Sequence, residues 1–171
     1  MTTSGKLAPR PSLRFLFAHP FHFVALGFGS GLAPLAPGTI GTLVAFPIFW
    51  WLEPRVAPAE FLIGLGFLFV GGVWVCDYTA RTLGIEDASC IVWDEIVAFL
   101  LVLFFTPHEL IWQAGAFALF RFFDAVKPGP VRYIESRFRG GFGIMVDDLV
   151  AAFLTLVCLT AGTLIAKRIG G

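Results

Sequence analysis

Long apolar runs, separated by short breaks with proline or charged residues, dominate the chain. Five runs can be delimited, at residues 39–52, 61–80, 88–106, 109–126 and 144–166. Residues 149–166 are eighteen consecutive uncharged positions, which is typical of a membrane-spanning helix. The other runs correspond to roughly 21–30 Å of helix at about 1.5 Å per residue, which is short for a full crossing. The pattern predicts an all-α, polytopic membrane protein with about four to five membrane helices.

The residues before the first run are of two kinds. Residues 1–12 contain proline, serine, threonine and basic side chains, and we expect a flexible cytosolic tail. Residues 13–28 are mostly apolar but include Arg14 and His19, which predicts a short helix at the membrane interface. The chain is too short for two comfortable domains, so residues 13–171 are treated as a single domain.

Residues 27–42 contain five glycines and two prolines and no charge. We expect no regular helix over this segment, because both residue types disfavour one. One hypothesis is that its backbone amides bind phosphate where the chain enters the next helix, and the alternative is close packing between membrane helices. The phosphate-binding candidates are Gly38, Thr39, Gly41 and Thr42.

Composition agrees with a membrane environment. Hydrophobic residues make up 57% of the chain and charged residues 14%, against about 25% charged in soluble domains. The formal net charge is zero, so no nucleic-acid partner is expected. The three cysteines form no CxxC pair and are interpreted as buried small hydrophobic residues.

The charges are distributed unevenly along the chain. If the tail is cytosolic and five spans alternate, nine of the twelve basic residues fall on the cytosolic side, in agreement with the positive-inside rule. The same topology brings the cytosolic ends of the helices together with most of the acidic residues: Asp77, Asp87, Asp94, Glu95, Asp124, Asp147 and Asp148. We therefore expect a site that faces the cytosol.

Two adjacent acidic pairs, Asp94–Glu95 and Asp147–Asp148, lie one to two turns inside apolar runs. An unpaired carboxylate in that position costs several kcal/mol, and adjacent carboxylates also repel each other. The helix dipole could stabilise each pair at a helix N-terminus. Two pairs on one membrane face favour a bound Mg²⁺ held by these four residues, since Mg²⁺ prefers oxygen ligands.

Arg121, Asp124 and Lys127 are spaced three residues apart and share one flank of a helix. They could form a salt-bridge ladder. Alternatively, Arg121 and Lys127 bind phosphate oxygens while Asp124 orients a cation or joins the metal site. The sequence lacks the cysteine-, aspartate- and histidine-nucleophile signatures of other phosphatases, which leaves metal-assisted hydrolysis. The three histidines have no metal-ligand spacing and are interpreted as satisfied or interfacial.

Three separated segments, GFGSGLAPLAPGTIGTL, IVWDE and RFFDAVKPGPV…GGFGIMVDDLVAA, closely resemble the phosphatidylglycerophosphatase A family over residues 27–152. The resemblance implies a Mg²⁺-dependent lipid phosphatase of the bacterial inner membrane, acting on the anionic phospholipid phosphatidylglycerophosphate to give phosphatidylglycerol and phosphate. The acidic positions that match the family are Asp87, Asp94, Glu95, Asp124, Asp147 and Asp148, with Arg121 and Lys127 as basic partners. Asp94, Asp124 and Asp148 are the catalytic candidates.

Three alternatives differ in what they require of the sequence. A phosphatase of the same family could act on another phospholipid phosphate. A non-enzymatic carrier would have charged residues distributed across the depth of the bilayer, whereas in this sequence the charged residues gather at one face. A phosphatidyl transferase needs a DG…AR…G…D…D pattern that is absent. The segment between Lys127 and Asp147 is expected to be a loop whose arginines, Arg132, Arg137 and Arg139, bind anionic headgroups.

The metal hypothesis predicts the result of a conservative substitution. Asp94→Asn or Asp148→Asn should abolish phosphate release, because an amide cannot replace a carboxylate as a metal ligand, while the protein still inserts in the membrane. Phosphate release and membrane fractionation of each variant measure the two effects. Full activity in either variant would contradict the hypothesis.

Overall fold

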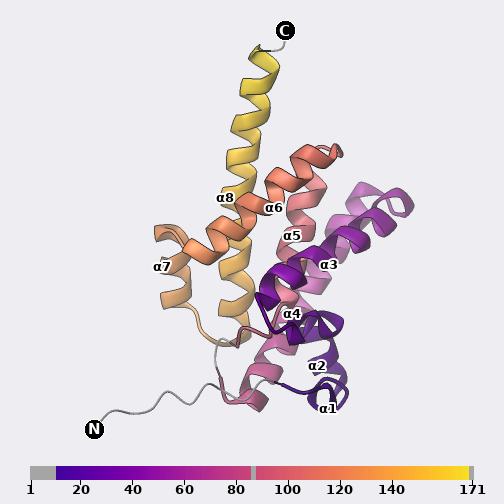
Figure 1. Cartoon of the computed structure of the whole chain (residues 1–171), viewed down its shortest axis with the longest axis vertical. Coiled ribbons are helices and arrows are strands. Elements are labelled where there is room, and N and C mark those ends of the chain that lie inside the picture. The colour runs from indigo at the N-terminus through magenta and orange to yellow at the C-terminus, as the bar shows by residue number, and fades with distance from the viewer. Residues whose placement is uncertain (1–10, 86–87, 170–171) are drawn as a thin grey trace.

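The computed structural model describes residues 11–85 and 88–169, and every regular element in them is a helix (Figure 1). The all-α prediction is therefore confirmed for this part of the chain. The elements are α1 (Leu13–Leu16), α2 (Pro20–Ala25), the 3₁₀ helix η1 (Gly27–Leu32), α3 (Pro37–Leu52), the 3₁₀ helix η2 (Glu53–Arg55), α4 (Pro58–Leu83), α5 (Trp93–Phe105), α6 (Leu110–Val126), α7 (Gly129–Arg137) and α8 (Gly140–Ile169).

Two helices of the described chain, α4 and α8, are long and apolar enough to cross a membrane. Helix α5 has 13 residues, which is about 20 Å of helix against a hydrocarbon core of about 30 Å. The predicted total of four to five crossings stays a prediction, because α3, α5 and α6 are shorter than α4 and α8.

The N-terminal segment differs from the prediction of one helix over residues 13–28. It forms two short helices, α1 and α2, because Pro20 lacks the N–H that a continuous helix needs and instead occupies the first turn of α2. His19 has an extended backbone and caps α2, with its Nδ1 accepting a hydrogen bond from the Phe21 amide at 3.2 Å.

The glycine-rich segment is also more helical than predicted. Residues 27–32 form η1, in which Phe28 and Gly29 have left-handed φ values of 60° and 103°. Helix α3 begins at Pro37, so the four candidate phosphate-binding residues lie in its first turns rather than in a loop. Similarly, the expected loop after Pro128 contains helix α7.

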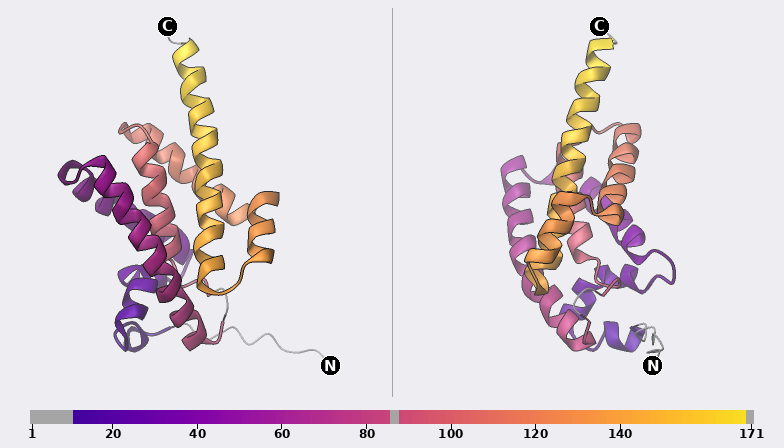
Figure 2. Two further views of the ribbon diagram at one scale, coloured as in Figure 1. Left: turned by 180° about the vertical axis from the view of Figure 1, so that it is seen from behind. Right: turned by 90° about the vertical axis from the view of Figure 1, so that its left-hand side faces the viewer.

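Helix α5 lies in the middle of the bundle and contacts α3, α4, α6 and α8, whereas the C-terminal part of α8 extends beyond the other helices (Figures 1 and 2). The C-terminal ends of α4 and α6 meet the N-terminal ends of α5 and α8. Contacts at the opposite end include His108 Nε2 and Glu53 Oε1, 3.7 Å apart. Because successive long helices run in opposite directions, these four helix ends lie close together at one end of the bundle.

Gly141 sets the distance between α4 and α8. A Cβ atom at this position would lie 1.9 Å from the Val73 carbonyl oxygen, so the two backbones are in direct contact. The Gly141 amide donates a hydrogen bond to Asp77 Oδ1 at 3.2 Å, and the other oxygen of Asp77 pairs with Arg81 at 2.8 Å. Asp77 therefore fastens the start of α8 to α4.

We predict that Gly141→Ala destabilises the protein by about 1–3 kcal/mol, because the added methyl group forces α8 away from α4. Gly71, on α4, has open space around the corresponding position and is the matched control. Gly71→Ala should be neutral or slightly stabilising, since alanine favours a helix. Thermal unfolding in detergent measures both variants, and equal melting temperatures would contradict the close-contact interpretation.

Candidate functional site

Five carboxylates gather where the helix ends meet. Asp94 and Glu95 come from the first turn of α5, where the helix dipole favours negative charge. Asp124 comes from the last turns of α6, and Asp147 and Asp148 come from the third turn of α8. Asp94 is 9% exposed and Asp148 is 3% exposed, which makes them the most buried of the described acidic residues.

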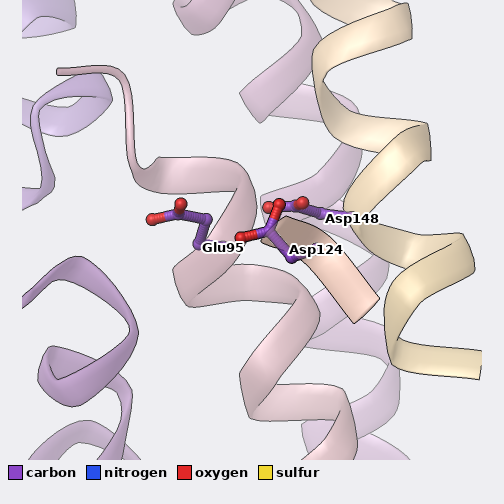
Figure 3. Close-up of side chains that lie close together, drawn as sticks. All are labelled: Glu95, Asp124 and Asp148. Carbon is purple, nitrogen blue, oxygen red and sulfur yellow. The ribbon is translucent and has the colours of Figure 1, made fainter. Parts of the chain in front are cut away.

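Three of these carboxylates lie close enough to share one ion. One oxygen each from Glu95, Asp124 and Asp148 lies within 4.8 Å of the other two, although the three residues come from three helices (Figure 3). Oxygen ligands lie at about 2.0–2.6 Å from Mg²⁺ or Ca²⁺, so two ligands of one ion are up to about 5 Å apart. The spacing therefore fits a small divalent cation.

Three buried oxygens of the site, Asp94 Oδ1, Glu95 Oε2 and Asp148 Oδ2, have no hydrogen-bond partner. Among the described residues, Asp94 and Asp148 also have no ion-pair partner. A buried carboxylate in this state is strongly unfavourable unless a cation or a donor reaches it. Because the set offers only oxygen ligands, it suits Mg²⁺ better than a soft transition metal.

Arg121 links three helices at the edge of the cluster. Its Nη1 lies 2.7 Å from Asp124 Oδ2 and 3.0 Å from Glu95 Oε1, and it donates a longer hydrogen bond to Thr42 Oγ1 at 3.4 Å. The Arg121–Asp124 pair of the predicted ladder of Arg121, Asp124 and Lys127 is therefore present, whereas Lys127 contacts Asp147 of α8. The same guanidinium also reaches α5 and α3, which the spacing along α6 did not reveal.

Lys127 ends α6 in a left-handed conformation, with φ at 45°, and its Nζ lies 3.0 Å from Asp147 Oδ2. The other oxygen of Asp147 accepts a hydrogen bond from the Asp148 amide at 3.1 Å. Successive residues on a helix point about 100° apart, so Asp147 and Asp148 face different partners. Asp147, predicted as a metal ligand, is turned to Lys127, and Asp124 instead joins Glu95 and Asp148.

The first turns of α3 lie against Glu95. A Cβ atom on Gly38 would lie 2.0 Å from Glu95 Oε1, and one on Gly41 would lie 3.2 Å from Glu95 Oε2. Thr42 donates a hydrogen bond to the Gly38 carbonyl at 2.8 Å, and Thr39 is half-buried in the same turn. The two glycines thus provide room for the Glu95 carboxylate.

Several other polar residues lie outside the cluster. Asp87, one of the family-matched positions, lies outside the described residues. Asp77, Arg81 and Arg139 line a separate cavity of about 490 Å³ at the α4–α8 junction. His22 is buried with its Nδ1 3.2 Å from Thr79 Oγ1, and burial together with His19 lowers the pKa of His22. His22 is therefore a satisfied histidine, as predicted.

Fold and site together define a helical protein with membrane-length apolar helices and a buried acidic cluster flanked by Arg121 and Lys127. The family model described as Phosphatidylglycerophosphatase A matches residues 23–163, which include the whole cluster. The chain belongs to the phosphatidylglycerophosphatase A family, and the resemblance found in the sequence is confirmed. Together with the two long apolar helices, this membership identifies a membrane protein.

Curated relatives agree with this assignment. Phosphatidylglycerophosphatase A of Haemophilus influenzae is 40% identical over 153 residues, covering 88% of this chain and 93% of the relative. Phosphatidylglycerophosphatase A of Escherichia coli is 38% identical over 143 residues, covering 83% of each chain. A provisionally named phosphatidylinositol-3-phosphatase of Bacteroides thetaiotaomicron is 38% identical, covering 80% of this chain and 89% of the relative. No solved structure matches.

The close contact at Gly38 yields a prediction. Gly38→Ala should lower phosphatase activity by about 100-fold, because the methyl group displaces the Glu95 carboxylate from Arg121 and from the cluster. Gly115→Ala on α6 adds a methyl group into open space and should leave activity unchanged. Phosphate release measures both variants, and an active Gly38→Ala protein would show that Glu95 does not need its present position.

Proposed function

We propose that the chain is a Mg²⁺-dependent phosphatase that converts phosphatidylglycerophosphate to phosphatidylglycerol and inorganic phosphate. Membership of the family supports the reaction, as do the names of the Escherichia coli and Haemophilus influenzae relatives. The proposal includes a multi-pass location in the bacterial inner membrane with the site at the cytosolic face. The uneven distribution of the basic residues supports this orientation.

The observation that carries the proposal is the set of buried, unpartnered oxygens on Asp94, Glu95 and Asp148. Glu95, Asp124 and Asp148 would hold Mg²⁺, with Asp94 beside them. The chemistry that a bound Mg²⁺ supplies is polarisation of the phosphate and a lower pKa of the attacking water. A site built for structure alone would pair these oxygens with protein donors.

The residues of the chain have separate roles in this reaction. Arg121 has five N–H donors, so it can bind phosphate oxygens while it keeps its contacts with Glu95 and Asp124. Lys127 adds a second positive charge at the end of α6, beside Asp147. The unpartnered Oδ1 of Asp94 is available to accept the proton of the attacking water, which is the role of a general base.

A second candidate function is hydrolysis of another phospholipid phosphomonoester. The Bacteroides thetaiotaomicron relative, named for a phosphoinositide, favours it, because its identity to this chain equals that of the Escherichia coli relative. The carrier hypothesis has less support, because the five clustered carboxylates meet at one end of the described helices rather than along a path through them.

Phosphate release from purified protein separates these functions. We expect release from phosphatidylglycerophosphate, with phosphatidylinositol 3-phosphate and phosphatidic acid as comparison lipids. EDTA should abolish the activity and excess Mg²⁺ should restore it, because the carboxylates need the cation to bind phosphate. Glu109→Gln, an exposed acid at the opposite end of the molecule, should have no effect. Full activity in EDTA would contradict metal dependence, and a preference for a comparison lipid would contradict the proposed substrate.

A further inference from the structure

An apolar groove runs along α5 between α3 and α4. Both helices pack on α5 but have little contact with each other, so α5 forms the floor and α3 and α4 form the walls. Ile96 and Leu100 lie on the floor, and Leu52 and Leu68 lie on the walls. The groove follows from this packing, since α3 and α4 stay apart along most of α5 and their side chains meet at Phe49 and Phe61.

The groove has two parts. The part at the Trp93 end of α5, called the upper part, has a volume of about 420 Å³. The part near Phe61, called the lower part, has a volume of about 150 Å³. Leu52, Leu68 and Leu100 line both parts, so the two parts are neighbours along α5. Glu60, at the far end, is the one ionisable side chain among the lining residues. The combined size is within the range of about 300–1,000 Å³ for ligand sites.

The upper end of the groove adjoins the acidic cluster. Trp93 and Ile96 line it, and they flank the cluster residues Asp94 and Glu95 in the sequence of α5. On α3, Gly41 lies against Glu95, and Ile48 of the groove follows seven residues later, roughly 10 Å along the helix. The groove therefore leads away from the cluster along α5.

Aromatic rings pack together at the lower end, and one side is open. The Phe61 ring stacks on Phe104 with centroids 5.2 Å apart and meets the Phe49 ring edge-on at 5.8 Å, which joins α3, α4 and α5 at the foot of the groove. At the upper rim, Trp51 is 59% exposed and Phe28 is 47% exposed. A lipid chain can thus enter from the side, as expected for a ligand that arrives from the bilayer.

We propose that this groove binds one acyl chain of the phospholipid substrate while its headgroup reaches the acidic cluster. The inference rests on the proposed function and adds where the lipid lies. The apolar walls favour a hydrocarbon chain, the end at Trp93 and Ile96 lies beside the cluster residues Asp94 and Glu95, and the aromatic rings at the foot limit the chain length. Long chains fill both parts of the groove and short chains fill only the upper part.

Filling the lower part tests the proposal. Gly64 lines that part and has open space around its Cβ position, so the side chain of Gly64→Leu starts in free space and extends from the groove wall. Gly66, on the same helix, also has open space but does not line the groove, and Gly66→Leu is the matched control. Size-exclusion chromatography and thermal unfolding confirm that both variants fold.

The readout is kcat/KM on dipalmitoyl and dioctanoyl phosphatidylglycerophosphate. Gly64→Leu should lower the dipalmitoyl value by about tenfold, because the leucine blocks the chain end, and should leave the dioctanoyl value unchanged. Gly66→Leu should change neither. Equal effects on the two lipids, or no effect of Gly64→Leu, would overturn the proposal.

A binding measurement separates this result from a failure of the proposed function. Wild-type protein without activity on either lipid contradicts the phosphatase, and the groove is then tested with phosphatidylglycerol carrying a diazirine at the end of one acyl chain. Photolabelling of the α4 and α5 peptides should occur in the wild type and in Gly66→Leu and should be lost in Gly64→Leu. Unchanged labelling in Gly64→Leu would overturn the proposal.

Discussion

Repulsion among buried carboxylates is the constraint on which the rest of this structure depends. Two buried and three half-buried carboxylates meet at the ends of α5, α6 and α8. In the described part of the chain, Arg121 pairs with Glu95 and Asp124, and Lys127 pairs with Asp147. Two like charges at the spacing found here repel by about 3–4 kcal/mol at an effective dielectric constant of about 20. The divalent cation proposed for this site would offset the repulsion.

The backbone is adapted to hold these charges close together. Gly141 lets α8 touch α4, Gly38 and Gly41 leave room for Glu95, and the left-handed Lys127 ends α6 beside Asp147. Each feature lets a helix end lie closer to its neighbour than a larger side chain or a regular helix would allow. Stability and activity are linked for this reason, since the packing that brings α5, α6 and α8 together also forms the site.

Much of this arrangement was predictable from the sequence. The apolar runs gave the five longer helices to within a few residues, and the acidic pairs indicated where those helices meet. Both Asp124 and Asp147 were candidates for the metal site, and the sequence could not decide which lies with Glu95 and Asp148, because that depends on the rotation of α6 and α8 about their axes. The glycines of α3 were ambiguous, since a phosphate loop and close helix packing share the same composition. The groove arises from helices distant in sequence and has no local pattern.

The most direct test of the account is equilibrium binding of Mn²⁺, as a spectroscopic substitute for Mg²⁺, to the purified protein by electron paramagnetic resonance. The account predicts saturable binding that Mg²⁺ displaces, that Asp148→Asn abolishes and that Glu109→Gln leaves intact. The absence of saturable binding, or equal binding by wild type and Asp148→Asn, would show that the carboxylates of α5, α6 and α8 do not form a metal site.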